Sequence, residues 1–252
     1  MSDPNNAAGV SEPSTNQPPD PARPDIPLRR RGVRSFVRRE GRITEGQRLA
    51  LAEHWPRYGI AEKAGGVLDF SAVFGRKAPL VLEIGCGDGA NLWHLARSRP
   101  EQDHIGIEVY RPGLGNLLLR LVREGLSNVR LVDSDAVEFL RERVPARSLD
   151  AAHILFPDPW PKKRHHKRRL IQPEFAGLMA QRLKRHGRLY LATDWPDYAE
   201  HMLSVLDAEP GLANLVGPGQ WAPRPRWRPT TKYERRAQRL GHPFFDLIYG
   251  SR

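Results

Sequence analysis

The chain has 252 residues, which is enough for one globular domain with extensions but tight for two full catalytic domains. Hydrophobic residues make up 39% of it, and no apolar run approaches the roughly 20 residues of a membrane-spanning helix, so we expect no integral membrane protein. The formal net charge of +11 favours partners that carry phosphate groups, because each neutralised phosphate releases condensed counterions.

Cysteine usage points to a reducing compartment. Cys86 is the single cysteine of the chain, which excludes an internal disulfide and a cysteine-based zinc site. The first residues lack the apolar core that a secretory signal peptide needs. Together these features predict a cytoplasmic protein.

The N-terminal segments differ in composition from the rest of the chain. Residues 1–27 are mostly Pro, Asn, Ser, Asp and Ala, with too little apolar surface to offset the entropy of ordering, and are predicted to form a disordered tail. Residues 28–42 form a basic arm in which Phe36 and Val37 are the expected anchors. This arm is either a solvated tail or a segment that becomes ordered on RNA. Residues 43–252 are expected to form a single domain.

A lead-in helix is expected at 44–55, because Thr44 and a Gln three residues later form a capping box ahead of apolar residues at helical spacing. Residues 69–77 are expected to connect this helix to the first strand. Near the other end of the chain, 217–229 is rich in Pro, Trp and Arg and is predicted to be a long loop. A terminal strand is expected at 244–249.

Between these ends, short apolar runs that suit buried parallel strands alternate with segments of helical spacing. The strands are expected at 80–84, 105–108, 129–132, 149–156 and 188–193, and the helices at 91–97, 115–124, 136–141, 172–183 and 195–206. Successive strands joined by helices predict an α/β fold with a doubly wound, mostly parallel sheet. Its ligands should bind at the C-terminal ends of the strands.

The first predicted strand ends in a glycine-rich turn. Glu83 is followed by Gly85, Gly87 and Gly89 at alternate positions, so the backbone can pass close to a ligand. This pattern resembles the E/D-x-G-x-G-x-G turn of S-adenosylmethionine-dependent methyltransferases and implies cofactor-binding roles for Glu83, Gly85 and Gly87. Read with Ala90 as its last residue, it would instead be a dinucleotide fingerprint, and a tight turn without a ligand is the third possibility.

Acidic residues end the next two predicted strands. Glu108 is expected to accept hydrogen bonds from the ribose hydroxyls of an adenosine. Asp135 could accept from the adenine amino group, act as the N-cap of the next helix, or do both. Asp133 competes with Asp135 for the adenine role. These positions complete a candidate cofactor site.

The fourth predicted strand runs into a more specific motif. Residues 156–165, FPDPWPKKRH, resemble the PDPW-x-K-x-R-H signature of the bacterial tRNA (guanine-N7-)-methyltransferase family, and 231–234, TKYE, resemble that family's C-terminal motif. The likeness covers roughly residues 34 to 250, with Pro161 where some relatives carry His. It implies a Rossmann-like class I methyltransferase fold and transfer of a methyl group from S-adenosylmethionine to N7 of a guanine in tRNA. By this resemblance the guanine is the one at position 46 of the variable loop.

The resemblance also implies roles for individual residues. Guanine N7 carries an in-plane lone pair, so the reaction needs alignment and charge stabilisation more than a base. Asp158 is therefore expected to be catalytic in the orienting and electrostatic sense and to contact the cofactor. Carboxylates suit the donors on the Watson–Crick edge of guanine. The substrate-binding residues implied are Lys162, Asp194, Thr231, Lys232, Tyr233 and Glu234.

Asp194 could instead be the N-cap of the following helix. The remaining basic residues up to Arg169 are expected to follow the tRNA backbone or to form a solvated loop. Trp160 and Trp195 could wall the base pocket by stacking, although Trp195 could equally pack in the core.

Several alternatives stay open. Another S-adenosylmethionine-dependent enzyme acting on an exocyclic amine of DNA or RNA is one, although the order P-D-P-W and the TKYE motif oppose it. A non-catalytic RNA-binding protein with the same fold is the second, and an NAD-dependent oxidoreductase is the third. We expect no metal, because His165 and His166 are adjacent, point in different directions and lie among Lys and Arg.

Overall fold

The computed structural model describes residues 34–36, 41–60, 66–230, 232–239, 241 and 243–252. All of them belong to one compact unit, Val33–Arg252. The tail predicted at 1–27, most of the basic arm and Thr231 lie outside the described residues. The expectations for those segments therefore remain predictions.

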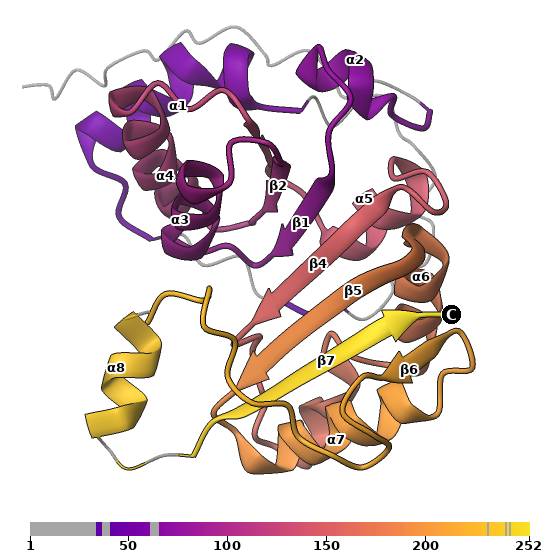
Figure 1. Ribbon diagram of the computed structural model, residues 1–252. Helices are drawn as coiled ribbons and strands as arrows, with labels where there is room; N and C mark the ends of the chain where they lie inside the picture. Colours follow the sequence, from indigo (N-terminus) through magenta and orange to yellow (C-terminus); the bar gives the residue numbers. More distant parts are fainter. Residues whose placement is uncertain (1–33, 37–40, 61–65, 231, 240, 242) are drawn as a thin grey trace, which may run out of the picture. The chain divides into compact units, whose positions relative to one another are not determined.

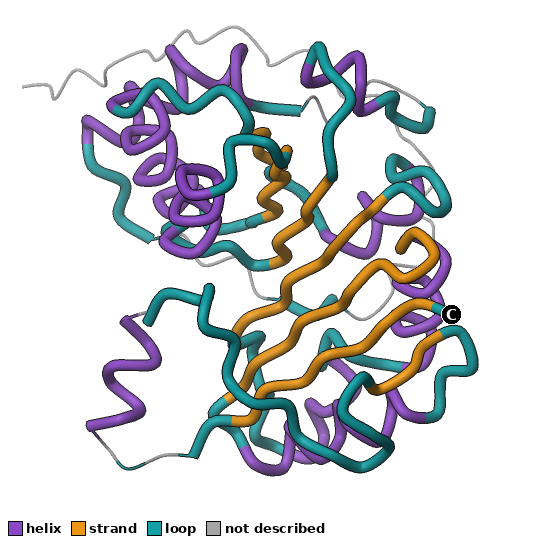
Figure 2. Tube along the Cα trace, in the orientation of Figure 1, coloured by secondary structure: helices purple, strands orange, loops and turns teal. Residues whose placement is uncertain are grey.

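A seven-stranded sheet forms the centre of the described unit, with the order β3-β2-β1-β4-β5-β7-β6. The five strands from β3 to β5 are parallel, whereas β7 runs antiparallel to both β5 and β6. Figure 1 shows this reversal of direction at β7, and Figure 2 shows the strands side by side. The bounds are β1 Leu80–Ile84, β2 Asp103–Ile107, β3 Val129–Val132, β4 Leu149–Leu155, β5 Leu183–Thr193, β6 Leu212–Asn214 and β7 Phe245–Ser251. The predicted doubly wound, mostly parallel sheet is confirmed.

Helices cover both faces of the sheet. One core cluster joins strand residues such as Leu82 and Ile154 to Phe139, Phe175 and Met202 of the helices on that face. The helices and the 3-10 helix η1 are α1 Glu45–Tyr58, α2 Phe70–Phe74, α3 Ala90–Ser98, α4 Arg111–Arg123, α5 Ala136–Glu142, η1 Lys163–Arg168, α6 Pro173–Arg182, α7 Pro196–Asp207 and α8 Lys232–Arg239. The first cluster contains α5, α6 and α7, and a second contains α1, α3 and α4. The result is a three-layer arrangement.

The strand order reverses between β1 and β4. From β1 the chain winds outward to β2 and β3, then crosses back to β4 on the other side of β1. Loops that leave the C-terminal ends of β1 and β4 diverge at such a point and leave a crevice between them. This topology places the glycine turn beside the loop that begins at Phe156.

Local sequence signals explain where several helices begin. The backbone N–H of Gln47 donates to Thr44 Oγ1 (3.3 Å), and that of Thr44 donates to Gln47 Oε1 (2.8 Å), so the predicted capping box is present. The connecting segment expected at 69–77 is wrong in part, because it contains α2. The Asp69 side chain caps this short helix, and Gly75 ends it at φ +71°.

No helix of the described part of the chain is long and apolar enough to cross a membrane.

Candidate functional site

A cleft of about 370 Å³ lies at the C-terminal ends of β1, β2 and β4. Four segments of the described chain line it: the glycine turn, the residues that follow β2, those that follow β3, and the loop that follows β4. Ser35 and Phe36 of the N-terminal arm add a further wall. The cleft therefore occupies the switch point of the sheet, where open α/β folds bind their ligands.

The glycine turn brings bare backbone to this cleft. Gly85, Gly87 and Gly89 all have positive φ, at +73°, +59° and +73°. A Cβ at Gly89 would also lie 2.4 Å from Leu117 in α4, so this position has no room for a side chain. Gly85 and Gly87 line the cleft, and with no Cβ they let a ligand approach the main chain.

Glu108 ties the glycine turn to the end of β2. Its Oε2 accepts a hydrogen bond from the backbone N–H of Gly87 (2.7 Å), and its Oε1 accepts from those of Val109 (2.8 Å) and Tyr110 (3.0 Å). Glu108 also lines the cleft. A carboxylate offers about four acceptor positions, so these bonds are compatible with a further hydroxyl donor from a ligand.

Glu83 is buried beneath the turn, with only 3% of its surface exposed. Asn91 in α3 donates a hydrogen bond to its Oε2 (2.7 Å). Burial raises the pKa of the Glu83 carboxyl to about 8; the bond from Asn91 opposes this rise, and the negative charges of Glu108 and Asp88 add to it. In this geometry Glu83 supports the strand, the turn and the helix that follows.

The two aspartates that follow β3, Asp133 and Asp135, have different neighbours. Asp135 is the N-cap of α5, where its Oδ1 accepts from the backbone N–H groups of Val137 (2.8 Å) and Glu138 (3.3 Å). Its neighbours in the chain, Ser134 and Ala136, line the cleft. Asp133 instead lines a second cavity of about 400 Å³ and lies 3.4 Å from Arg111 Nη1. The N-cap role predicted for Asp135 is present, and its contact with adenine stays a prediction.

The loop after β4 closes the other side of the cleft. Phe156, Pro157 and Asp158 line it, so Asp158 shares one cavity with Gly85 and Glu108. Phe156 and Trp160 have φ values of +54° and +46°, the left-handed region that aromatic residues seldom adopt. Backbone of this kind is found at functional sites whose surroundings hold it in place.

The N-terminal arm contacts this same loop. Trp160 Nε1 donates a hydrogen bond to the backbone oxygen of Ser35 (3.0 Å), and Arg168 Nε donates to that of Arg34 (3.3 Å). The Arg168 guanidinium also lies over the Trp160 ring, 4.3 Å from its centroid. Trp160 is thus engaged in holding the arm and the basic run together.

Most of the basic run forms η1, a 3-10 helix that the sequence did not predict. Lys162, Lys163, Arg164 and Lys167 are exposed and available to a polyanion. Arg169 is different, because it is buried: its Nε donates to the backbone oxygen of Pro159 (2.9 Å), and its Nη2 pairs with Asp197. Arg169 supports the loop from inside, and the backbone-following role suggested for it is not supported by its burial.

The C-terminal motif lies in α8, which the sequence did not predict. Glu234 is buried, and its Oε1 lies 2.8 Å from Arg224 Nε and 3.0 Å from Arg228 Nη1. Lys232 and Tyr233 belong to the first turn of this helix. The described structure covers the backbone of these two residues and does not extend to Thr231.

Two further predicted substrate residues lie outside the cleft wall. Asp194 directly follows β5 and is half-buried, and Lys162 is exposed just before η1. Among the described residues, no group of three or more His, Cys, Asp or Glu side chains could hold a metal ion. The arrangement brings Gly85, Gly87, Glu108 and Asp158 into one cavity and leaves the substrate roles as predictions.

Sequence reasoning missed several residues of the site. Ser35 and Tyr110 line the cleft without any motif that marks them. Phe36, which the sequence singled out only as an anchor of the basic arm, lines the cleft as well. Arg224 and Arg228, which hold Glu234, were hidden in a loop with several similar arginines.

Comparisons with known proteins agree with this geometry. The family described as "Putative methyltransferase" matches residues 77–247. A "tRNA (guanine-N(7)-)-methyltransferase" of Alcanivorax borkumensis is 52% identical over 222 residues, covering 88% of this chain and 92% of that protein. The protein of the same name in Stutzerimonas stutzeri is 53% identical over 220 residues, covering 87% of this chain and 92% of that protein.

Among solved structures, the 16S rRNA methyltransferase KamB matches with a TM-score of 0.54 and 16% identity, covering 77% of this chain and 99% of that one. At this identity the match supports the fold alone. It agrees with the class I, Rossmann-like architecture expected from the sequence.

Proposed function

The chain belongs to the family of tRNA (guanine-N(7)-)-methyltransferases, enzymes named for methylation of guanine N7 in tRNA, and on this premise we propose how its residues carry out the reaction. The methyl donor is S-adenosylmethionine, and the target is a guanine in the variable loop of tRNA. Because tRNA is the substrate, the enzyme works in the cytoplasm. The observation that carries the proposal is the shared cavity of Asp158, Glu108 and the glycine turn.

The cleft has the features that the cofactor requires. Gly85 and Gly87 present backbone without side chains, and Glu108 offers carboxylate oxygens for ribose hydroxyls. Asp135, the N-cap of α5, lies between the cleft-lining residues Ser134 and Ala136 in the chain and is proposed to accept from the adenine amino group. When bound, S-adenosylmethionine supplies an electrophilic methyl group on a positively charged sulfur.

Asp158 acts on the positive charge that passes from the cofactor sulfur to the purine during methyl transfer. Guanine N7 needs no deprotonation, so a carboxylate in the cleft wall serves to orient the reactants and to stabilise positive charge as it passes to the purine. The left-handed backbone at Phe156 and Trp160 on either side fixes the path of this loop.

Guanine recognition is assigned to two carboxylates beyond the cleft. Asp194 follows the end of β5, and Glu234 is held by ion pairs with Arg224 and Arg228. Ionised carboxylates accept hydrogen bonds from guanine N1–H and the N2 amino group. Lys162, with the TKYE residues Thr231, Lys232 and Tyr233, is proposed to contact the same nucleotide.

The exposed basic run binds the tRNA backbone. Lys163, Arg164 and Lys167 lie on η1, next to the loop that carries Asp158. Their charges would fix the register of the tRNA without reading its sequence.

Replacement of Asp158 tests the reaction. With labelled S-adenosylmethionine and tRNA, we expect Asp158→Asn to lower kcat on the order of 100-fold, because electrostatic stabilisation is lost while size is kept. Binding of tRNA should remain within a few-fold of the wild type. The matched control is Glu101→Gln, an exposed carboxylate just before β2 at the opposite edge of the sheet, which should leave kcat unchanged.

Nucleoside analysis of the product distinguishes the alternatives. Label in N7-methylguanosine supports the proposal, and label in N6-methyladenosine contradicts it. If the wild type retains tRNA but transfers no methyl group, and Asp158→Asn behaves like the wild type, the chain is a binding protein only.

A further inference from the structure

We propose that Arg228 is a positioning residue, whose buried guanidinium fixes the Glu234 carboxylate relative to the loop that carries Asp158. Nothing in the sequence motifs marks it, since it lies in a loop three residues before TKYE. The inference rests on the proposed role of Glu234 in guanine binding. It joins the two halves of the site that the motifs define separately.

The first observation is that Arg228 contacts two buried carboxylates at once, Glu234 through an ion pair and Asp246 through hydrogen bonds. Its side chain is fully buried, and Nη1 lies 3.0 Å from Glu234 Oε1. Nη2 lies 3.0 Å from Asp246 Oδ1 and 3.1 Å from Asp246 Oδ2. Asp246 belongs to β7, so one guanidinium anchors Glu234 of α8 to the sheet.

The second observation is a contact with the loop after β4. The Arg228 guanidinium lies over the Phe156 ring, 5.5 Å from its centroid, and Phe244 meets the same ring edge-on at 6.2 Å. Phe156 is the left-handed residue that lines the cleft two positions before Asp158. Arg228 therefore touches both the guanine-binding side and the methyl-transfer side of the site.

The third observation concerns the chemistry of the group. Burial raises the pKa of the Asp246 carboxyl, and the Arg228 charge opposes that rise. A buried ion pair is weak evidence for stability, because apolar residues of similar size often serve as well. A planar guanidinium, however, presents donors in a fixed fork and stacks on an aromatic face, which an ammonium group cannot reproduce. The geometry points to orientation as the task of Arg228.

Arg228→Lys is the test, because it keeps the charge and loses the fork. We expect kcat for tRNA methylation to fall about tenfold or more, while the KM for tRNA and the S-adenosylmethionine affinity from calorimetry each stay within about threefold. Alignment of the guanine is impaired, whereas the phosphate contacts and the cofactor cleft are untouched.

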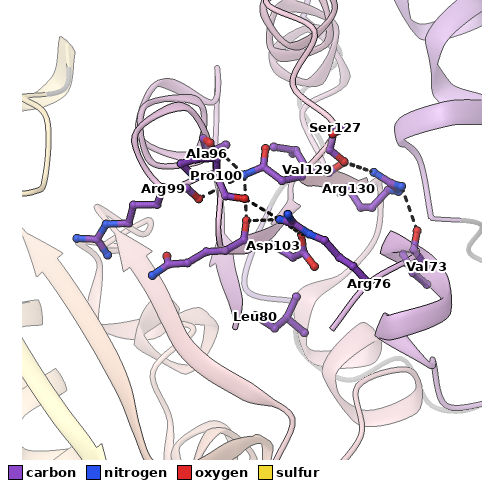
Figure 3. A network of polar contacts seen from close by, with 12 residues as sticks. Val73, Arg76, Leu80, Ala96, Arg99, Pro100, Asp103, Ser127, Val129 and Arg130 are labelled. Carbon is purple, nitrogen blue, oxygen red and sulfur yellow. Dashed lines mark hydrogen bonds and ion pairs between the residues drawn. The ribbon is translucent and has the colours of Figure 1, made fainter. Parts of the chain in front are cut away.

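The matched control is Arg76→Lys. Arg76 also donates two hydrogen bonds to a buried carboxylate, from Nε (2.9 Å) and Nη2 (2.7 Å) to Asp103 Oδ1, at the end of the strands away from the site. Figure 3 shows this pair, with Arg76 also meeting the backbone oxygen of Pro100. We expect this variant to lower the Tm without changing kcat.

A double-mutant cycle with Glu234→Gln completes the test. If Arg228 acts through Glu234, adding Arg228→Lys to Glu234→Gln should lower kcat little further. If the fold-loss of kcat in the double variant equals the product of the losses in Arg228→Lys and Glu234→Gln, the two residues act independently and the proposal is overturned. A kcat of Arg228→Lys equal to that of Arg76→Lys would also overturn it.

Folding of the test variant is a separate concern. If Arg228→Lys does not fold, Asp246→Asn removes one anchor and keeps the pair with Glu234. This variant should show a smaller loss of kcat with cofactor affinity intact, and a kcat equal to the wild type would overturn the inference. Failure of the proposed function is distinguishable, because the wild type itself would then form no N7-methylguanosine.

Discussion

His104 on β2 and His153 on β4 are buried on the same face of the sheet, on either side of β1. Burial lowers the pKa of His104 to about 4 and that of His153 to about 3, and the positive charge of Arg99 contributes to both shifts. His153 also stacks on Trp227, with ring centroids 4.7 Å apart, which holds the 217–229 loop against the sheet. These side chains stay neutral in the folded protein.

Acid should therefore destabilise the fold through these residues. The folded pKa of each histidine lies below its unfolded value of 6.5, so between pH 6.5 and about 4 the unfolded state binds protons that the folded state does not. Stability contributed by each neutral histidine is present above pH 6.5 and is lost as the pH falls. One such group changes the unfolding free energy by about 1.4 kcal/mol per pH unit.

We predict that His153→Phe lowers the slope of the unfolding free energy against pH by about 1.4 kcal/mol per pH unit, the contribution of one titrating group. The substitution keeps an aromatic ring to stack on Trp227 and removes the imidazole that titrates. Urea unfolding followed by fluorescence from pH 4.5 to 6.5 measures the slope. Glu83, whose raised pKa gives a slope of opposite sign in this range, is present in both proteins and cancels in the comparison. Equal slopes in the two proteins would contradict the prediction.

Helix α4 packs closely against the glycine turn of the proposed cofactor site. A Cβ at Gly113 would lie 2.3 Å from the backbone oxygen of Gly87 and 2.9 Å from its carbonyl carbon. The clash is with backbone and not with a flexible side chain, so the turn or the helix would have to move. The backbone N–H of Gly87 also donates to Glu108, which would carry the disturbance across the cleft.

Gly113→Ala should therefore weaken S-adenosylmethionine binding about tenfold or more, although alanine favours helix by up to about 1 kcal/mol over glycine. Calorimetry with the cofactor measures the effect. Gly46→Ala in α1 is the matched control, since no atom lies within 4 Å of its added Cβ, and it should raise stability with binding unchanged. If Gly113→Ala binds S-adenosylmethionine as tightly as the wild type, the prediction is wrong and α4 shifts to make room for the alanine side chain.

The elements that the sequence predicted are those with a strong local pattern. Buried apolar runs identified the five parallel strands, and the capping box at Thr44 identified the start of α1. Four elements were not predicted, each for a physical reason. The first, α2, has only five residues, too few to show a helical spacing of apolar residues. The sequence of η1, KRHHKR, has no apolar residues at helical spacing. Helix α8 is highly charged, and its Glu234 pairs with arginines of the preceding loop. Strand β6 has only three residues and depends on pairing with β7.

The same contrast holds within the site. Gly85, Gly87, Glu108 and Asp158 were predicted because a motif or a strand end singled each of them out, and the structure brings them into one cavity. Arg228 could not be predicted, since its role depends on tertiary contacts with Asp246 and Phe156. Residues that act through long-range pairing leave no local signal in the sequence.

Charge shapes how the whole molecule meets its substrate. The net charge is +11, and exposed Lys162, Lys163, Arg164 and Lys167 lie beside the loop of the proposed methyl-transfer site. Desolvation lowers the pKa of His165, and the positive charges of Arg164 and the other cations of the run lower it further, so this side chain resists gaining a charge. The tRNA contacts made here should come from permanent cations.

Affinity for tRNA should consequently fall steeply between about 50 and 200 mM salt, because each neutralised phosphate releases counterions. We predict that Arg164→Gln reduces the slope of log K against log salt by about one, the share of a single phosphate contact. Arg185→Gln is the matched control: Arg185 is equally exposed but lies at the end of β5 away from Asp194, so its loss should leave the slope unchanged. Filter binding over a salt series measures both slopes. If the slope of log K against log salt falls equally in the two variants, the attraction comes from net charge alone. The basic run then makes no local contact with the tRNA backbone.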